Sequence, residues 1–140
     1  MVIHVNSLAF SGIEAVNVDV QVHIAAGIPS FTIVGLADKT ISESKERVRA
    51  ALNSFGLALP AKKILVNLAP ADLLKEGSHF DLPIACGILA SLGILPQDEI
   101  MDYYVIGELS LDGSIMPVSG VLPAGICANS KKKGPNLSFA

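Results

Sequence analysis

The sequence predicts an α+β fold in which helices pack against a mixed β-sheet. Three observations support this class. Strand-like alternation dominates the first third of the chain, helix-like apolar segments follow it, and the expected order of elements, βββαβαββα, does not alternate strictly. Of the 140 residues, 51% are hydrophobic but only 5% are aromatic, so the core is aliphatic. This length supports one buried core, and we expect residues 1–140 to form a single domain.

The first third of the chain is expected to be a β-meander. Residues 2–10 have the composition of a short strand, and from Val16 to Ile24 apolar residues alternate with polar ones, which is typical of a strand with one wet face. A turn at 27–29 then leads to residues 31–34, which we expect to pair with the preceding strand. The side chains expected to face the core are Val16, Val18, Val20, Val22 and Ile24.

A helix is expected to begin at Thr40. The segment from Thr40 to Glu43 fits a capping box, in which both side chains bind free backbone N–H groups. Glu43 and Arg47 are four residues apart on the expected surface, and Gly56 suits the C-terminal cap. The apolar stripe of this helix is expected to contain Ile41, Val48, Ala51, Leu52 and Phe55.

A short apolar strand at 64–68 is expected in the centre of the sheet, followed by a polar loop at 70–79. Residues 80–92 then predict a helix that is apolar on nearly all sides and therefore buried. We expect three of its side chains to pack across the sheet, namely Ile84, Ile88 and Leu89.

The C-terminal part is expected to contain a hairpin and a third helix. Leu111-Asp112-Gly113 lies between apolar runs at 103–106 and 114–116, and Asp-Gly between such runs is a strong hairpin signal. Residues 122–133 predict the closing helix. Its end carries Lys131, Lys132 and Lys133, which match the helix dipole and are also the densest candidate for contacts with DNA.

Composition places the chain in the cytoplasm and gives it no general attraction for nucleic acid. The net charge is −3, whereas nucleic-acid binding depends on neutralising phosphates. The longest apolar stretch, 82–95, is interrupted and shorter than a membrane span, and the N-terminus lacks the pattern of a secretory signal. Cys86 and Cys127 have no metal-ligand spacing and are interpreted as buried thiols.

The sequence shows no motif for binding a nucleotide or a metal. Neither GxxxxGK[ST] nor GxGxxG occurs, so we expect no cofactor in this chain. His4, His23 and His79 lie on separate elements, without the spacing of paired metal ligands. Ser78, His79 and Asp81 are the residue types of a nucleophilic site, but neighbours in sequence rarely point at one another, and we interpret them as helix-capping groups.

Three long motifs together cover nearly the whole chain. The first runs from Val34-Gly35-Leu36-Ala37-Asp38 through Glu43 to Ala51. The second runs from Val66-Asn67-Leu68-Ala69-Pro70-Ala71-Asp72 through Lys75-Glu76-Gly77 to Phe80-Asp81-Leu82-Pro83-Ile84-Ala85, and the third runs from Gly107-Glu108-Leu109-Ser110-Leu111-Asp112-Gly113 to Pro117-Val118-Ser119-Gly120-Val121-Leu122-Pro123. In this order and spacing, the motifs resemble the N-terminal, Lon-protease-like domain of the ComM/YifB family of magnesium-chelatase-like AAA+ ATPases.

This resemblance implies a ribosomal-protein-S5 domain-2-like fold, in agreement with the order βββαβαββα. It also implies an AAA+ ATPase domain further along a longer protein, with ATP and Mg²⁺ as that domain's cofactors. Whole proteins of the family form hexameric rings, so the implied partners are further copies of the chain and DNA, with no membrane. The ComM branch acts on branched DNA during recombination of incoming strands.

The resemblance to Lon peptidases also identifies the positions of their catalytic Ser and Lys. Here His79 stands at the position of the Ser and Leu122 at the position of the Lys. A leucine cannot accept a proton, so no catalytic residue is carried over and peptidase activity is not expected.

Three readings of function follow from the sequence. The first is a non-catalytic accessory and assembly domain of the ring ATPase. The second is a hydrolase that uses Ser78, His79 and Asp81 on a Lon-like fold. The third is an RNA-binding module that uses Lys62, Lys63 and residues 131–133. The third reading is less favourable, because RNA-binding faces use aromatic side chains and this chain has few.

Overall fold

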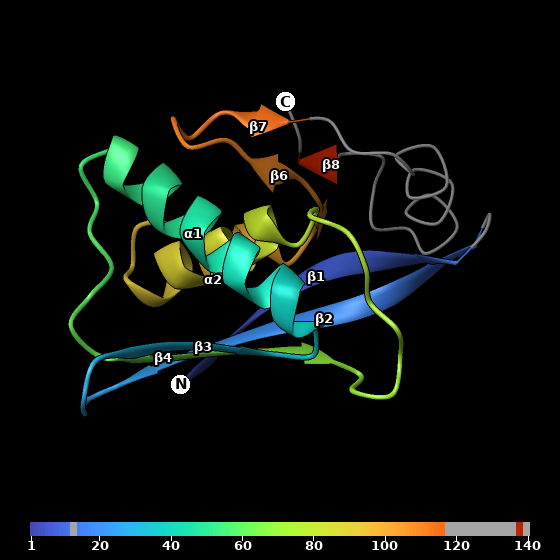
Figure 1. The fold of residues 1–140 in the computed structure, drawn as a ribbon, viewed down its shortest axis with the longest axis horizontal. Helices are drawn as coiled ribbons and strands as arrows, with labels where there is room; N and C mark the ends of the chain where they lie inside the picture. The colour runs from blue at the N-terminus through green and yellow to red at the C-terminus, as the bar shows by residue number, and fades with distance from the viewer. Residues whose placement is uncertain (12–13, 117–136, 139–140) are drawn as a thin grey trace.

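The computed structural model describes residues 1–11, 14–116 and 137–138, and it confirms a mixed sheet covered by helices on one face (Figure 1). Its elements are β1 (Val2–Ser11), β2 (Glu14–Ala25), β3 (Ser30–Val34), α1 (Asp38–Ser54), β4 (Lys63–Ala69), α2 (Asp81–Ser91), α3 (Gln97–Ile100), β5 (Tyr104–Val105), β6 (Glu108–Leu109), β7 (Ile115–Met116) and β8 (Leu137–Ser138). None of the helices described is both long enough and apolar enough to cross a membrane.

The main sheet has the strand order β1-β2-β4-β3, so the expected β-meander was wrong. β1 and β4 both pair antiparallel with β2, but β3 pairs only with β4 and runs parallel to it. The register shows the insertion directly, because Lys63 faces Ala25 on one side and Ser30 on the other. A parallel pair needs a crossover, which α1 provides. The prediction that residues 64–68 lie centrally is confirmed.

The core lies between the sheet and the helices α1 and α2. Val18, Val20 and Val22 are fully buried on the helix-covered face, and Ile84 and Ile88 of α2 are buried with them, as expected. Val16 and Ile24, near the ends of β2, are only partly buried, and Leu89 is partly buried against the core. Burying each such side chain contributes about 1.5–3 kcal/mol.

Helix α1 begins two residues earlier than expected. Its N-cap is Ala37, no side chain caps it, and the amide of Ile41 donates to the carbonyl of Ala37 at 2.9 Å. The predicted capping box is therefore wrong, because Thr40 already lies in the first turn. Phe55 is 65% exposed at the C-terminal end, outside the buried stripe, whereas Gly56 has the left-handed φ of +76° predicted for the cap.

The expected Asp-Gly hairpin exists, but its first strand is β6 and not residues 103–106. The chain leaves that run at Gly107, whose amide donates to the carbonyl of His79 and whose carbonyl accepts from the amide of Leu82. These two bonds tie the segment to the start of α2, so the partner of β7 comes from the residues that follow. β5 pairs instead with β8, in parallel. The helix expected at 122–133 lies outside the described residues.

Candidate functional site

Ser78, His79 and Asp81 lie where the loop after β4 enters α2, but the structure does not assemble them into a catalytic site. The ring of His79 donates from Nε2 to the carbonyl of Leu8, at 2.7 Å, and the carboxylate of Asp81 is bound by groups from α1 and β6. Helix α2 has no side-chain cap, so the interpretation of these residues as capping groups was wrong. Two separate polar contacts therefore replace the expected cap.

Asp81 forms the centre of a buried polar network, which we call the Asp81 cluster and define as Ser44, Arg47, Asp81 and the amide of Leu109. The hydroxyl of Ser44 donates to Oδ1 at 2.6 Å, and the amide of Leu109 donates to Oδ2 at 3.1 Å. Arg47 donates from Nε to Oδ2 at 2.5 Å and from Nη2 to Oδ1 at 3.2 Å. Asp81 is fully buried, and four donor groups compensate its charge.

The Asp81 cluster joins three elements that are far apart in sequence, namely α1, α2 and β6. The hydrogen bond to Asp81 raises the pKa of Arg47 against the opposing effect of burial, so the guanidinium stays charged. The expected Glu43–Arg47 contact is also present, but its 3.9 Å separation makes it the weaker interaction. Sequence reasoning assigned Arg47 to the surface and missed Ser44. The available signal was their three-residue spacing beside the apolar stripe, which puts both on one helix face.

His79 is 4% exposed and lies between two aromatic rings. Its ring centroid is 5.0 Å from that of Phe10 and 4.2 Å from that of Phe80. Burial lowers the pKa of His79, against smaller raising effects from the Leu8 carbonyl and the Asp81 charge. Since a carbonyl can only accept, Nε2 carries the proton, and the neutral imidazole acts as a bridge between the loop and β1.

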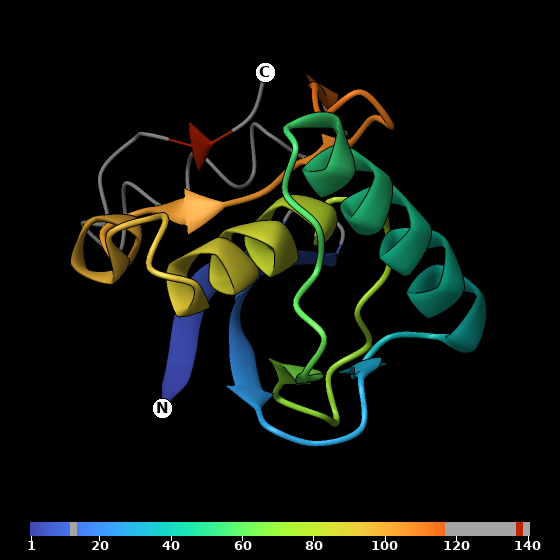
Figure 2. The same cartoon turned by 90° about the vertical axis from the view of Figure 1, so that its left-hand side faces the viewer.

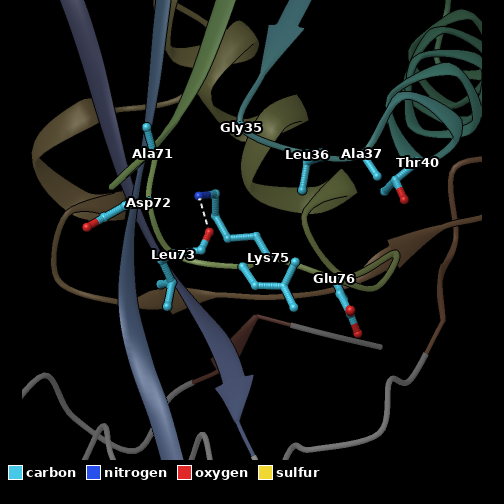
Figure 3. Close-up of a pocket in the computed structure, with 10 residues that line it drawn as sticks. Gly35, Leu36, Ala37, Thr40, Ala71, Asp72, Leu73, Lys75 and Glu76 are labelled. Atoms are coloured by element: carbon cyan, nitrogen blue, oxygen red, sulfur yellow. Dashed lines mark hydrogen bonds between the residues drawn. The ribbon is translucent and has the colours of Figure 1, made fainter.

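A pocket of about 520 Å³ lies between the segment that enters α1 and the loop after β4 (Figure 3). Its lining residues are Gly35, Leu36, Ala37, Thr40 and the loop residues from Ala71 to Glu76. Gly35 is required there, because its φ is +104° and a Cβ would lie 2.7 Å from the carbonyl oxygen of Leu68. We therefore asked whether any side chain that lines this pocket is placed to act as an acid, a base or a nucleophile.

Among the described residues that line this pocket, Lys75 alone is both charged and buried, at 4% exposure. Its Nζ donates to the carbonyl of Pro70 at 2.5 Å. It also donates to the carbonyl of Leu73 at 2.8 Å, the bond drawn in Figure 3. Burial lowers its pKa, while the charge of Asp72 opposes the shift. With its ammonium directed at two carbonyls of its own loop, Lys75 shapes the loop and is not placed as a free base. Sequence reasoning missed it because a loop lysine is exposed by default.

Most of the remaining predicted site residues lie where the structure is not described. Leu122 and residues 131–133 lie outside the described part of the chain, and so does Cys127. Cys86 is partly buried, and burial raises its pKa to about 11. Within 1–11, 14–116 and 137–138, no three His, Cys, Asp or Glu side chains are grouped so as to hold a metal ion.

The sequence of the chain is similar to proteins of a known family. The profile of the family described as "Subunit ChlI of Mg-chelatase" matches residues 20–136. Over 92% of its length the chain is 46% identical to the competence protein ComM of Haemophilus influenzae, and over 84% it is 44% identical to YifB of Escherichia coli, a protein described as uncharacterized. It covers 25% and 23% of these relatives, so it spans about a quarter of their length.

A more distant similarity connects the chain with a peptidase. Over 85% of its length it is 27% identical to Lon protease 2 of Bacillus subtilis, of which it covers 24%. Both the profile match and the two closer relatives extend over most of the chain, and they agree with each other. The chain therefore belongs to the magnesium-chelatase-like family that includes ComM and YifB.

Proposed function

We propose that this chain is an accessory domain, without catalytic chemistry of its own, of a larger cytoplasmic ATPase that assembles into a ring and acts on branched DNA. Membership of the magnesium-chelatase-like family supports the proposal of a larger parent protein. The name of the Haemophilus relative connects that relative with competence. The ATP and Mg²⁺ that such an activity needs would bind outside these 140 residues, which would form one domain with a ribosomal-protein-S5 domain-2-like, Lon-like topology.

One observation carries the non-catalytic role: the side chains best suited to chemistry are engaged inside the fold. Nε2 of His79 donates to the carbonyl of Leu8, and the carboxylate of Asp81 accepts from Ser44, Arg47 and the amide of Leu109. A Ser–His–Asp mechanism needs a histidine that is free to take the proton of the nucleophile and is oriented by the carboxylate. Among the described residues, no hydrogen bond joins His79 to Asp81, and the Leu8 carbonyl orients the imidazole instead, which disfavours the hydrolase alternative.

The purified chain should hydrolyse neither ATP nor peptides. A coupled ATPase assay and a fluorescent casein assay test this directly, with the His79→Ala variant as the control for a hydrolase. Turnover that disappears in His79→Ala would replace the proposal with the hydrolase reading. ATPase activity in the chain alone would likewise contradict it.

The role in DNA binding is tested in the full-length protein. Lys131, Lys132 and Lys133 would contribute phosphate contacts that are repeated around a ring, so that weak individual contacts add through high effective concentration. Replacing all three with Ala should weaken branched-DNA affinity and reduce its dependence on salt. If affinity and salt slope stay unchanged, these lysines are excluded and assembly remains the role of the domain.

A further inference from the structure

A small basic hollow lies between α1 and the start of β3. It has a volume of about 190 Å³, and its charged lining residues are Arg49 of α1 and Lys62 from the loop before β4. The rest of its lining is mainly apolar, and consists of Pro29, Ser30, Phe31, Leu59, Pro60 and Ile64. We call this feature the basic hollow.

The two cations of the basic hollow are available to a partner. Both are exposed, and Lys62 makes no ion pair within the described part of the chain. Arg49 contacts one carboxylate, that of Glu46, at 3.6 Å. Because the Glu46 side chain is 76% exposed, this ion pair is weak. Lys45 adds positive charge nearby, with its Nζ 5.9 Å from the centre of the Phe31 ring.

An acidic, partly apolar projection lies on the other side of the molecule. The short helix α3 and the residue pair after it carry Asp98, Glu99 and Asp102, all exposed and without an ion pair to any described residue. Four exposed apolar side chains lie within six residues of these carboxylates in the sequence, namely Leu92, Ile94, Met101 and Tyr103. We call this feature the α3 projection. It has no counter-charge of its own on α3.

The two surfaces lie beyond opposite edges of the sheet. The α3 projection is next to β1, where the side chain of Asn6 donates to the carbonyl of Met101. The basic hollow adjoins β3, the other edge strand. Figure 2 shows the separation, with the orange turn of α3 at the left and α1 and β3 at the right. A contact between unlike surfaces on opposite edges joins copies head to tail, which closes into a ring or continues as a chain.

We propose that the basic hollow receives the α3 projection of a second copy of this chain, an inference that rests on the proposed assembly and names its contact surfaces. The hollow is smaller than the roughly 300–1,000 Å³ of sites that enclose small molecules, and its size suits one or two protruding side chains. Its apolar lining with a charged rim has the anatomy of a protein interface. Nucleic acid fits less well, because two rim cations neutralise few phosphates and the chain carries a net charge of −3.

Charge reversal tests this contact in the 140-residue chain by sedimentation velocity. The unsubstituted chain should associate as its concentration rises. Arg49→Glu/Lys62→Glu alone and Asp98→Lys/Glu99→Lys alone should each associate at least about tenfold more weakly, because like charges then meet. A chain carrying all four substitutions should recover association, since the charges are again complementary. Lys39→Glu, an exposed change of the same size on α1 away from the hollow, is the control for Lys62→Glu and should associate normally.

Several results would overturn the inference. One is a chain that stays monomeric up to about 1 mM, a concentration that would reveal a dissociation constant of that order. A second is a four-fold substituted chain that stays monomeric while its circular dichroism spectrum shows it to be folded. A third is single-stranded DNA binding that is lost in Arg49→Glu/Lys62→Glu with no self-association, which assigns the hollow to nucleic acid. Neither ATPase activity nor branched-DNA binding enters this test, so it can fail while the proposed function holds.

Discussion

Arg47 of α1 donates hydrogen bonds to both carboxylate oxygens of Asp81 at the start of α2, from Nε to Oδ2 at 2.5 Å and from Nη2 to Oδ1 at 3.2 Å. The Asp81 side chain is 1% exposed and that of Arg47 20%, so water screens this pair poorly. The two residues are 34 positions apart in the sequence, and their contact joins α1 to α2. It is the clearest electrostatic determinant of the helix layer.

Removing the guanidinium should strongly destabilise the fold. Arg47→Ala leaves a buried carboxylate without its counter-charge, which costs about 3–5 kcal/mol of unfolding free energy. Urea denaturation monitored by circular dichroism measures this. Arg49→Ala, on the same helix but with a half-exposed side chain, should change stability by no more than about 0.5 kcal/mol. Equal losses in the two variants would contradict the buried role of Arg47.

His79 should make stability depend on pH. Its folded-state pKa is lowered from 6.5, mainly by burial, so the unfolded chain binds the proton more readily. The stability from neutral His79 is complete above about pH 6.5 and is lost as the pH falls toward the lowered pKa. Unfolding free energy should therefore decline over that window.

The variant His79→Gln should flatten this part of the pH profile, because glutamine does not titrate. Urea midpoints measured at closely spaced pH values give the slope for each protein. His23→Gln, at an exposed position on β2, is the matched control and should retain the slope. A slope that survives in His79→Gln would assign the pH dependence to other groups.

Gly87 should not tolerate a side chain. A Cβ at this position of α2 would lie 2.4 Å from Cγ2 of Val22, on the sheet that α2 packs against. Gly87→Ala should therefore destabilise by about 1–3 kcal/mol through overpacking, although alanine favours a helix. Thermal unfolding of Gly87→Ala and of Gly87→Ala/Val22→Ala separates the two effects. If shortening Val22 does not relieve part of the loss, steric conflict is not its cause.

Ser91 at the end of α2 offers the opposite case. Its hydroxyl is buried and has no hydrogen-bond partner among the residues that the structure describes. Ser91→Ala removes an uncompensated polar group and should leave the chain as stable or stabilise it by about 1 kcal/mol. Ser44→Ala is the informative comparison, because that hydroxyl donates to Asp81 and its loss should destabilise. Loss of stability in Ser91→Ala would reveal a partner for the hydroxyl.

The sequence by itself determined the local structure where one periodic pattern dominates. Alternating valines fixed β2 and its buried face, and the apolar segment 80–92 fixed α2 as a buried helix, because burying apolar side chains outweighs other local preferences. The central position of β4 followed from the same reasoning. Each of these features depends on which side chains avoid water, and a sequence shows that directly.

Only the tertiary structure decided pairing and polar contacts. Whether β3 lies beside β2 or beside β4 depends on the crossover through α1, and the composition of β3 is compatible with either neighbour. Arg47 and Asp81 are likewise ordinary surface residues until α1 and α2 pack together, because long-range polar contacts have no period in the sequence. His79 was singled out as a catalytic type, but the carbonyl of Leu8, 71 residues away, makes it a buried bridge. These polar contacts form only after distant elements have packed together, so the order of residues along the chain does not reveal them.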